Sequence, residues 1–273
     1  LSKQQRKEIK NIFKEQYNKD LIRLLEEESF STDFKNLIVS MFEEQEELDA
    51  KSLYKAMKGA GTDEDTLIEI LCSRTPEEIE KIKESYKKIY NEDLEKWIED
   101  ETSSLFQTYL LNILKGNRSQ NKKPDKDKCR EIVDEIISRT EGENRWEYED
   151  FDKLKVFLDS SPRELILIAR FYHKIKGQTF LTYIENNFSG DIQKALIATM
   201  YSLCNPSEYF ANKINKSVKG AGTDEAMLIR TLVSREEIDM EYIRQYYQLL
   251  FDKNMHDDIG NDTSGCFKKL LLS

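Results

Sequence analysis

The heptapeptide Lys-Gly-Ala-Gly-Thr-Asp-Glu occurs twice in this chain, at residues 58–64 and at residues 219–225. Because glycine tolerates positive φ angles, two glycines one residue apart allow the backbone to fold back and turn several carbonyl oxygens outward. Such carbonyls are part of what a hard cation needs, since Ca²⁺ takes about six to eight oxygen ligands, usually including a bidentate carboxylate. The heptapeptide alone lacks a suitably placed carboxylate, which must come from elsewhere.

A candidate carboxylate recurs at a constant distance from both copies. Glu101 lies 42 residues after Gly59, and Asp262 lies 42 residues after Gly220. Each acid opens a short polar stretch between two expected helices, and antiparallel helices would bring this stretch and the glycine loop to the same end of a helical unit. The spacing therefore predicts two calcium sites, each made of loop carbonyls and one distant acid.

Two other interpretations of the heptapeptide were weighed against the metal site. A single Gly-x-Gly-Thr segment would be explained better as a helix C-cap followed by a helix N-cap. The second copy, with its acid at the same offset, favours the metal site. A nucleotide-binding loop fits poorly, because it would need a glycine at Glu64, no strand precedes the segment and no Gly-Lys-Ser/Thr follows.

The two copies belong to a longer internal duplication. Residues 58–111 align with residues 219–272 without a gap. Weaker copies occur at residues 8–28 and 183–203, so the chain holds about three and a half units of about 70 to 85 residues.

Within each unit, apolar residues recur at spacings of three and four, which indicates short amphipathic helices. Gly59 and Gly61 are expected to end one helix, Pro76 to open another, and Thr62 to cap a helix with Asp65 at its third position. The second unit is therefore predicted to contain five helices, over about residues 48–58, 63–72, 76–84, 85–100 and 103–114.

Composition narrows the class of protein. The 273 residues are 38% hydrophobic, which is enough for a sizeable core, and the formal net charge of -10 argues against binding to nucleic acid. No run of about 18 apolar residues and no charged-then-apolar leader occurs, so we expect a cytoplasmic protein. The four cysteines are far apart and are expected to be reduced and mostly buried: Cys72, Cys129, Cys204 and Cys266.

The duplicated segments resemble the repeats of the annexin family. The resemblance is carried by MKGAGTDEDTLIEILCSRT with EDETSS and by VKGAGTDEAMLIRTLVSRE with NDTSG, and it extends along essentially the whole chain. It implies an all-α fold in which four five-helix repeats form a curved disc, with the first repeat partial. In that family, calcium sites on the convex face bind acidic phospholipid headgroups.

The resemblance also implies a division of the chain. Its parts are a partial first repeat with the last three helices (1–47), a second repeat (48–118), a third repeat with a degenerate calcium loop (119–204) and a fourth repeat (205–273). In the first part Glu28 is an acid without a glycine loop, and about 30 to 45 residues of the family pattern are missing. If they are truly absent, apolar faces within residues 9–25 and 34–42 should be partly uncovered, which would favour instability or self-association.

The family's calcium ligands can be carried over residue by residue. For the second repeat they are the carbonyl oxygens of Met57, Gly59 and Gly61 and both carboxylate oxygens of Glu101. For the fourth repeat they are the carbonyl oxygens of Val218, Gly220 and Gly222 and the carboxylate of Asp262.

Weaker secondary sites would join the Thr62 carbonyl to Glu64, and the Thr223 carbonyl to Glu225. The alternative for both acids is an ordinary favourable interaction with a helix macrodipole. Four loop residues are expected to contact the membrane, although the lysines are equally compatible with an ordinary surface: Lys58, Ala60, Lys219 and Ala221.

The third repeat departs from the pattern. Glu147 and Tyr148 stand where glycine and threonine would be, and Asn187 replaces the acid. A neutral amide cannot supply a bidentate negative charge, so no primary-type site is expected there. Trp146 aligns with a position from which some annexins insert tryptophan into lipid, but in this rewritten loop a packed or merely solvent-touched ring is favoured.

The expected function is calcium-dependent binding to acidic phospholipid surfaces. Two alternatives stay open: a calcium-regulated scaffold for cytoskeletal or other protein partners, and an ion-conducting protein associated with membranes. An enzyme is not expected, because His173 and His256 lie in different repeats without a recognisable nucleophile and acid beside them.

Overall fold

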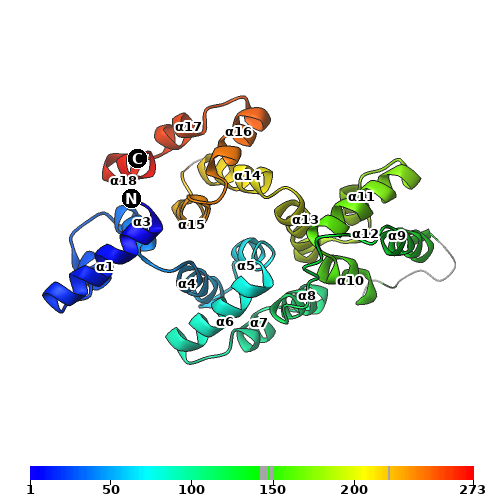
Figure 1. The fold of residues 1–273 in the computed structure, drawn as a ribbon, viewed down its shortest axis with the longest axis horizontal. Helices are drawn as coiled ribbons and strands as arrows, with labels where there is room; N and C mark the ends of the chain where they lie inside the picture. Colours follow the sequence, from blue (N-terminus) through cyan, green and yellow to red (C-terminus); the bar gives the residue numbers. More distant parts are fainter. Residues whose placement is uncertain (142–146, 148–149, 221) are drawn as a thin grey trace. The chain divides into compact units, whose positions relative to one another are not determined.

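A computed structural model of the chain describes residues 1–141, 147, 150–220 and 222–273 (Figure 1). These residues form α-helices and contain no strand, which confirms the predicted all-α class. The chain divides into two compact units, one formed by Asp49–Pro206 and the other by Leu1–Leu48 together with Ser207–Ser273. Among the described residues, every helix is too short or too polar to cross a lipid bilayer.

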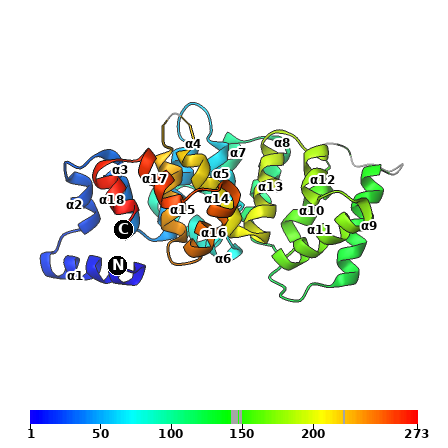
Figure 2. The same ribbon diagram turned by 90° about the horizontal axis from the view of Figure 1, so that it is seen from above.

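The unit of residues 49–206 contains two successive sets of five helices. The first set is α4 (Gln45–Met57), α5 (Glu64–Leu71), α6 (Pro76–Tyr90), α7 (Leu94–Glu101) and α8 (Ser104–Leu114). The second set is α9 (Lys126–Glu141), α10 (Asp152–Asp159), α11 (Pro162–Lys176), α12 (Phe180–Asn187) and α13 (Gly190–Cys204). Helix α13 packs against α5, α8 and α11 (Figure 2), and the buried Tyr109 and Thr199 hydroxyls share a 2.7 Å hydrogen bond between α8 and α13.

The other unit combines the two ends of the chain. Its helices are α1 (Lys3–Tyr17), α2 (Leu21–Glu27), α3 (Thr32–Phe42), α14 (Pro206–Val218), α15 (Glu225–Arg235), α16 (Met240–Phe251), α17 (Met255–Asp262) and α18 (Gly265–Leu271). Helix α3 packs against α15 and α18 around a core of Leu37, Ile229 and Phe267. The amphipathic pattern of the sequence therefore supplies the apolar contacts that join the N-terminal helices to the C-terminal ones.

One predicted helix boundary is wrong. The third and fourth helices of the second set were expected over residues 76–84 and 85–100, but α6 continues to Tyr90 and α7 begins only at Leu94. Asn91 ends α6 with a φ of 55°, and its N–H donates to the Lys87 carbonyl at 2.9 Å. Asparagine tolerates this left-handed conformation better than most residues, so the stop signal lies in Asn91 rather than in the hydrophobic spacing.

The expectation of uncovered apolar faces holds for α1 but not for α3. Ile9 is 39% exposed, whereas Ile82 and Ile243, which occupy the same position in α6 and α16, are fully buried. In α3, by contrast, Leu37 and Val39 are buried. The cysteine expectation is also met only in part, since Cys72 and Cys129 are buried, Cys204 is half-buried and Cys266 is exposed.

A buried ion pair holds the start of the larger unit together. The Arg74 guanidinium, in the connection between α5 and α6, donates from Nε to Asp49 Oδ2 at 2.7 Å and from Nη2 to Oδ1 at 3.0 Å. Both side chains are almost completely buried. Burial opposes the charge on Arg74, but the nearby carboxylates, Asp49 foremost, together outweigh this effect and raise the pKa of the guanidinium. This two-pronged geometry fixes α4 against the α5–α6 connection.

Removing one partner of this pair should be strongly destabilising. In Arg74→Met, the Asp49 carboxylate would stay buried without its counter-charge, and we expect a loss of about 3 to 5 kcal/mol in the free energy of unfolding. The measurement is urea denaturation followed by circular dichroism. Arg23→Met serves as the control, because the Arg23–Glu27 pair is exposed and its loss should cost at most about 0.5 kcal/mol. Equal shifts in the two variants would contradict the assignment.

Candidate calcium sites

The first glycine loop joins α4 to α5 and is shaped by its two glycines. Gly59 has a φ of 120° and Gly61 a φ of 93°, conformations that glycine adopts without the steric cost of a Cβ atom. The Asp63 N–H donates to the Ala56 carbonyl at 2.8 Å and closes the loop. Residues 58–61 are all exposed, so the backbone of this loop is accessible to an ion or a surface.

The second loop, between α14 and α15, repeats the same backbone. Gly220 and Gly222 have φ values of 127° and 103°, and the Asp224 N–H donates to the Ser217 carbonyl at 2.8 Å. Ala221, one of the predicted membrane contacts, lies outside the described residues. The identical heptapeptides therefore produce matching turns in the two units.

Each predicted acid lies beside its predicted loop. The Thr62 hydroxyl is 3.1 Å from Glu101 Oε2 and 3.2 Å from the Glu101 carbonyl oxygen. In the other unit, the Thr223 hydroxyl is 2.5 Å from Asp262 Oδ2 and 2.9 Å from the Asp262 carbonyl oxygen. Because Glu101 ends α7 and Asp262 ends α17, helix packing brings a carboxylate to a loop 39 residues earlier in both cases.

These contacts correct the predicted helix cap. Thr62 was expected to cap α5, but the capping residue is Asp63, whose carboxylate accepts from the Thr66 N–H at 3.1 Å. Asp224 does the same for α15, accepting from the Met227 N–H at 2.9 Å. The sequence contained this signal, since aspartate is among the preferred N-cap residues. With Asp63 as the cap, the Thr62 hydroxyl is available to hold the acid.

The remaining predicted ligands lie at the edges of the two loops. Met57 is buried and Val218 is half-buried, so the carbonyl is the group that each would offer to an ion. Glu64 and Glu225 are half-buried in the first turns of α5 and α15, where the helix macrodipole also favours them. Glu64 and Glu101 line one surface pocket of about 450 Å³, together with Asp100 and Asp191.

The residues beneath the first loop form an aromatic cluster. The Tyr54 ring stacks on Tyr90 with centroids 3.8 Å apart, and the Trp97 ring lies 5.4 Å from Tyr54. The Lys58 ammonium lies over the Tyr54 ring, 5.1 Å from its centroid, which is a cation–π geometry. Lys58 is therefore not simply extended into solvent, although it is exposed.

The second loop has a polar network at the equivalent place. Asn215 replaces the tyrosine, and its amide donates to the Tyr247 hydroxyl at 3.2 Å. That hydroxyl donates to Asp258 at 2.8 Å, and Lys253 pairs with the same carboxylate at 3.3 Å. Lys219 is exposed at this loop. Sequence analysis did not predict this difference between the two sites.

The third and first repeats do not form this arrangement. The Asn187 amide donates to the Tyr183 carbonyl of its own helix at 2.8 Å. Glu147 is exposed, while Trp146 and Tyr148 lie outside the described residues. Glu28 follows α2 as an exposed C-cap. Acids and glycine loops therefore meet only in the second and fourth repeats of the chain that the structure describes.

The donor set of the two loops suits a hard cation. Within the described ranges, no three His, Cys, Asp or Glu side chains are close enough together to hold a metal ion by themselves. A cation at these loops would therefore depend largely on backbone oxygens, supplemented by one carboxylate. Oxygen-only coordination with flexible geometry is what Ca²⁺ accepts, whereas Zn²⁺ favours nitrogen and sulfur ligands.

Comparisons with known proteins indicate the family of the chain. The Annexin family profile matches residues 48–113 and 209–273, the two ranges that contain the loop and acid pairs. Human annexin A4 is 38% identical over 98% of this chain and 83% of its own length, and human annexin A13 is 35% identical over 98% and 84%.

Solved structures show the same fold. Annexin III superposes with a TM-score of 0.93 at 33% identity, covering 99% of this chain and 83% of that one. A calcium-bound annexin (Sm)1 superposes with a TM-score of 0.88 at 25% identity, covering 99% and 80%. The chain therefore belongs to the annexin family, whose members are known as calcium-dependent phospholipid-binding proteins.

The glycine loops can be tested for backbone strain. A Cβ atom at Gly59 or Gly61 would meet no other atom within 4 Å, so the cost of Gly59→Ala or Gly61→Ala should come from the left-handed backbone alone. We expect each to lower the free energy of unfolding by about 1 to 2 kcal/mol. Ala60→Ser, in the same exposed loop, is the control and should have little effect. An equal cost for Ala60→Ser in urea denaturation would contradict this account.

Proposed function

We propose that this protein binds acidic phospholipid membranes peripherally when Ca²⁺ occupies the loops of its second and fourth repeats. The observation that carries the proposal is the pairing of a threonine hydroxyl with a carboxylate 39 residues later, repeated at both loops. This pairing holds an anionic oxygen beside a loop of exposed backbone. The partial and degenerate repeats would contribute the helical framework rather than primary calcium sites.

Calcium at each site would be bound incompletely by the protein. Three loop carbonyls and one bidentate carboxylate supply about five oxygens, fewer than Ca²⁺ normally takes. The open positions can accept a lipid phosphate or the carboxylate of a serine headgroup. In the second repeat the ligands are Met57, Gly59, Gly61 and Glu101, and in the fourth they are Val218, Gly220, Gly222 and Asp262.

The energetics favour calcium and lipid binding together. With one carboxylate per site, the solution affinity for Ca²⁺ should be weak, with a Kd of about 10⁻⁴ to 10⁻³ M. A lipid that completes the coordination shell raises the affinity for the ion, and the ion raises the affinity for the lipid by the same factor. Two loops in one chain add effective concentration once the first has bound.

Net charge explains why the ion is needed. At a leaflet potential near -30 mV, each negative charge costs about 0.7 kcal/mol before screening. A protein with a formal charge of -10 is therefore repelled by the surface that it is proposed to bind. Calcium at the loops reverses the sign of the charge locally, so association should occur only when Ca²⁺ is present.

Further residues extend the proposed sites. Secondary calcium positions would use the Thr62 carbonyl with Glu64, and the Thr223 carbonyl with Glu225. Because they are exposed at the loops, Lys58, Ala60 and Lys219 would contact headgroups, and Ala221 completes the proposed set of membrane contacts.

The proposed repeat boundaries are 1–47, 48–118, 119–204 and 205–273. The proposed location is the cytoplasm, with reversible attachment to membranes.

Co-sedimentation with phosphatidylserine vesicles tests the central proposal. The wild-type protein should pellet with vesicles in millimolar Ca²⁺ and stay in solution when a chelator removes the ion. The double variant Glu101→Gln, Asp262→Asn should lose this pelleting, because a neutral amide cannot act as a bidentate anionic ligand.

The control for that experiment is Glu99→Gln, Asp257→Asn. It removes the same two charges from exposed positions of α7 and α17, and it should pellet like the wild type. Failure of the wild-type protein to pellet at millimolar Ca²⁺ would refute the proposal. Pelleting only with added protein partners would instead favour the calcium-regulated scaffold.

The threonine tether gives a separate prediction. In Thr62→Val, Thr223→Val, the carboxylates lose a hydrogen bond of the charge-assisted class, worth about 1.5 to 3 kcal/mol. We expect the Ca²⁺ concentration for half-maximal vesicle binding to rise at least about tenfold. Thr108→Val, at a half-buried position of α8 outside the two loops, is the matched control. An unchanged calcium requirement would show that the tether does not pre-organise the sites.

A further inference from the structure

The second and third repeats differ at one residue beside a shared structural feature. Both α6 and α11 begin with a capping box, in which Thr75 and Ser161 are the N-cap residues. The residue before the cap is Arg74 in one repeat and Ser160 in the other. Arg74 is a buried guanidinium held by Asp49, whereas Ser160 is uncharged and its carbonyl accepts from the Arg118 guanidinium at 3.3 Å.

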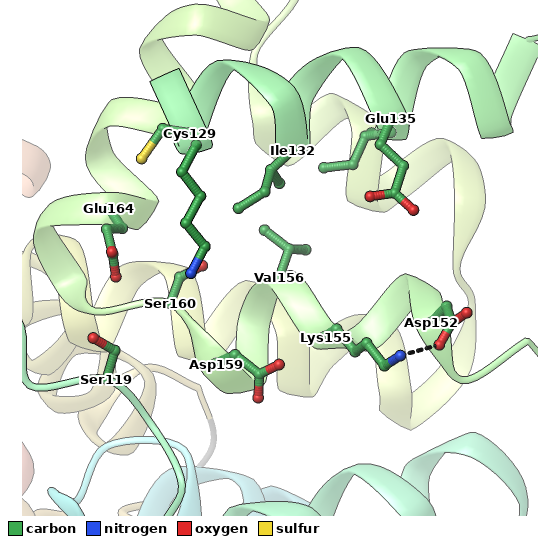
Figure 3. A pocket seen from close by; sticks show the side chains of 12 residues that line it. Ser119, Cys129, Ile132, Glu135, Asp152, Lys155, Val156, Asp159, Ser160 and Glu164 are labelled. Carbon is green, nitrogen blue, oxygen red and sulfur yellow. Dashed lines mark ion pairs between the residues drawn. The ribbon is translucent and has the colours of Figure 1, made fainter. Parts of the chain in front are cut away.

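A cavity lies beside Ser160. It has a volume of about 300 Å³, at the lower end of the range for ligand pockets, and it lies between α9 and α10 beside the start of α11 (Figure 3). Apolar side chains from α9 and α10, including Ile132 and Val156, form one wall. The cavity belongs to one compact unit and is remote in sequence from both calcium loops.

The charged groups of this cavity favour a cation. Four carboxylates line it, from Glu135, Asp152, Asp159 and Glu164, against two lysines, Lys128 and Lys155, which leaves a formal balance of -2. Lys155 is already paired with Asp152 at 2.5 Å (Figure 3). The Asp159 and Glu164 carboxylates are on the side of the cavity near Ser160.

Two buried groups offer hydrogen-bonding capacity to a ligand. Ser160 is 6% exposed and lines the cavity, so its hydroxyl is placed to bond to a ligand. Glu164 is 7% exposed, and one of its carboxylate oxygens accepts the Ser161 N–H at 2.7 Å. Burial, together with the nearby Glu164 charge, raises the pKa of the Cys129 thiol, so this thiol adds no charge to the cavity.

In the second repeat, the position that corresponds to Ser160 holds a guanidinium. There the buried guanidinium of Arg74 is stabilised by Asp49 and further by Glu78, the capping-box glutamate that corresponds to Glu164. A guanidinium is flat, permanently charged and weakly hydrated, so it binds buried carboxylates better than an ammonium does. The third repeat retains the glutamate and has the Ser160 hydroxyl in place of the arginine.

We propose that the cavity between α9 and α10 binds an alkylguanidinium cation, supplied either by a small molecule or by an arginine side chain of a peptide. The guanidinium would donate to Glu164, Asp159 and the Ser160 hydroxyl. Its alkyl stem would lie along Ile132 and Val156. This site is independent of the proposed membrane binding, because it uses none of the calcium-loop residues.

The test is a titration of the full chain followed by NMR chemical shifts or calorimetry. Agmatine represents the small molecule, the tripeptide Gly-Arg-Gly represents the peptide source, and urea is the neutral isostere. Saturable binding of agmatine or the tripeptide, with no saturable response to urea, is the expected result. Comparison of the first two probes distinguishes the two sources of the cation.

Variants link the binding to this cavity. Ser160→Arg would place a guanidinium of the protein's own in the cavity and should abolish binding, while Gln178→Arg adds the same charge at an exposed site and should not. Glu164→Gln retains the capping box and should weaken binding at least fivefold, which keeps the test valid if Ser160→Arg does not fold. The absence of saturable binding, equal binding by urea, or unchanged binding in Glu164→Gln would overturn the proposal.

Discussion

A hydrogen bond between a threonine hydroxyl and a carboxylate 39 residues later is the constraint on which the functional geometry depends. It requires that α7 end at Glu101 on the same side of the unit as the loop that follows α4. The left-handed backbone of Asn91 makes this possible, because it ends α6 and lets the chain turn before α7 begins. The glycines then let the loop backbone face outward beside the acid, which helix propensity alone would not arrange.

The two sites share their backbone but differ in what supports them. Beneath the first loop, Tyr54 stacks on Tyr90, and the Lys58 ammonium lies over the Tyr54 ring. Beneath the second, Tyr247 and Asp258 belong to a hydrogen-bonded network. An aromatic cluster excludes water and gains from dispersion, whereas a polar network is sensitive to the charge of its carboxylate. The two loops should therefore respond differently to their surroundings even though their sequences are identical.

The third repeat keeps the helical framework but lacks the acid of the candidate calcium sites. Ser104, Gly190 and Gly265 occupy the same position after the acid or its substitute, and all three have positive φ angles. The turn is thus common to three repeats, but the Asn187 amide donates to the Tyr183 carbonyl of its own helix. The helical skeleton is set by apolar spacing and caps, while the proposed calcium ligands occupy few positions and can be lost independently of the fold.

The sequence by itself determined the helical class, the duplication, the glycine loops and the offset of Glu101 and Asp262, because these depend on local backbone preferences and on spacing. Family membership followed from the same motifs. The tertiary structure alone decided that the Thr62 hydroxyl holds Glu101 and that a cavity lies beside Ser160. Such partnerships join side chains far apart in the chain, so they are fixed by how the helices pack and not by any local pattern.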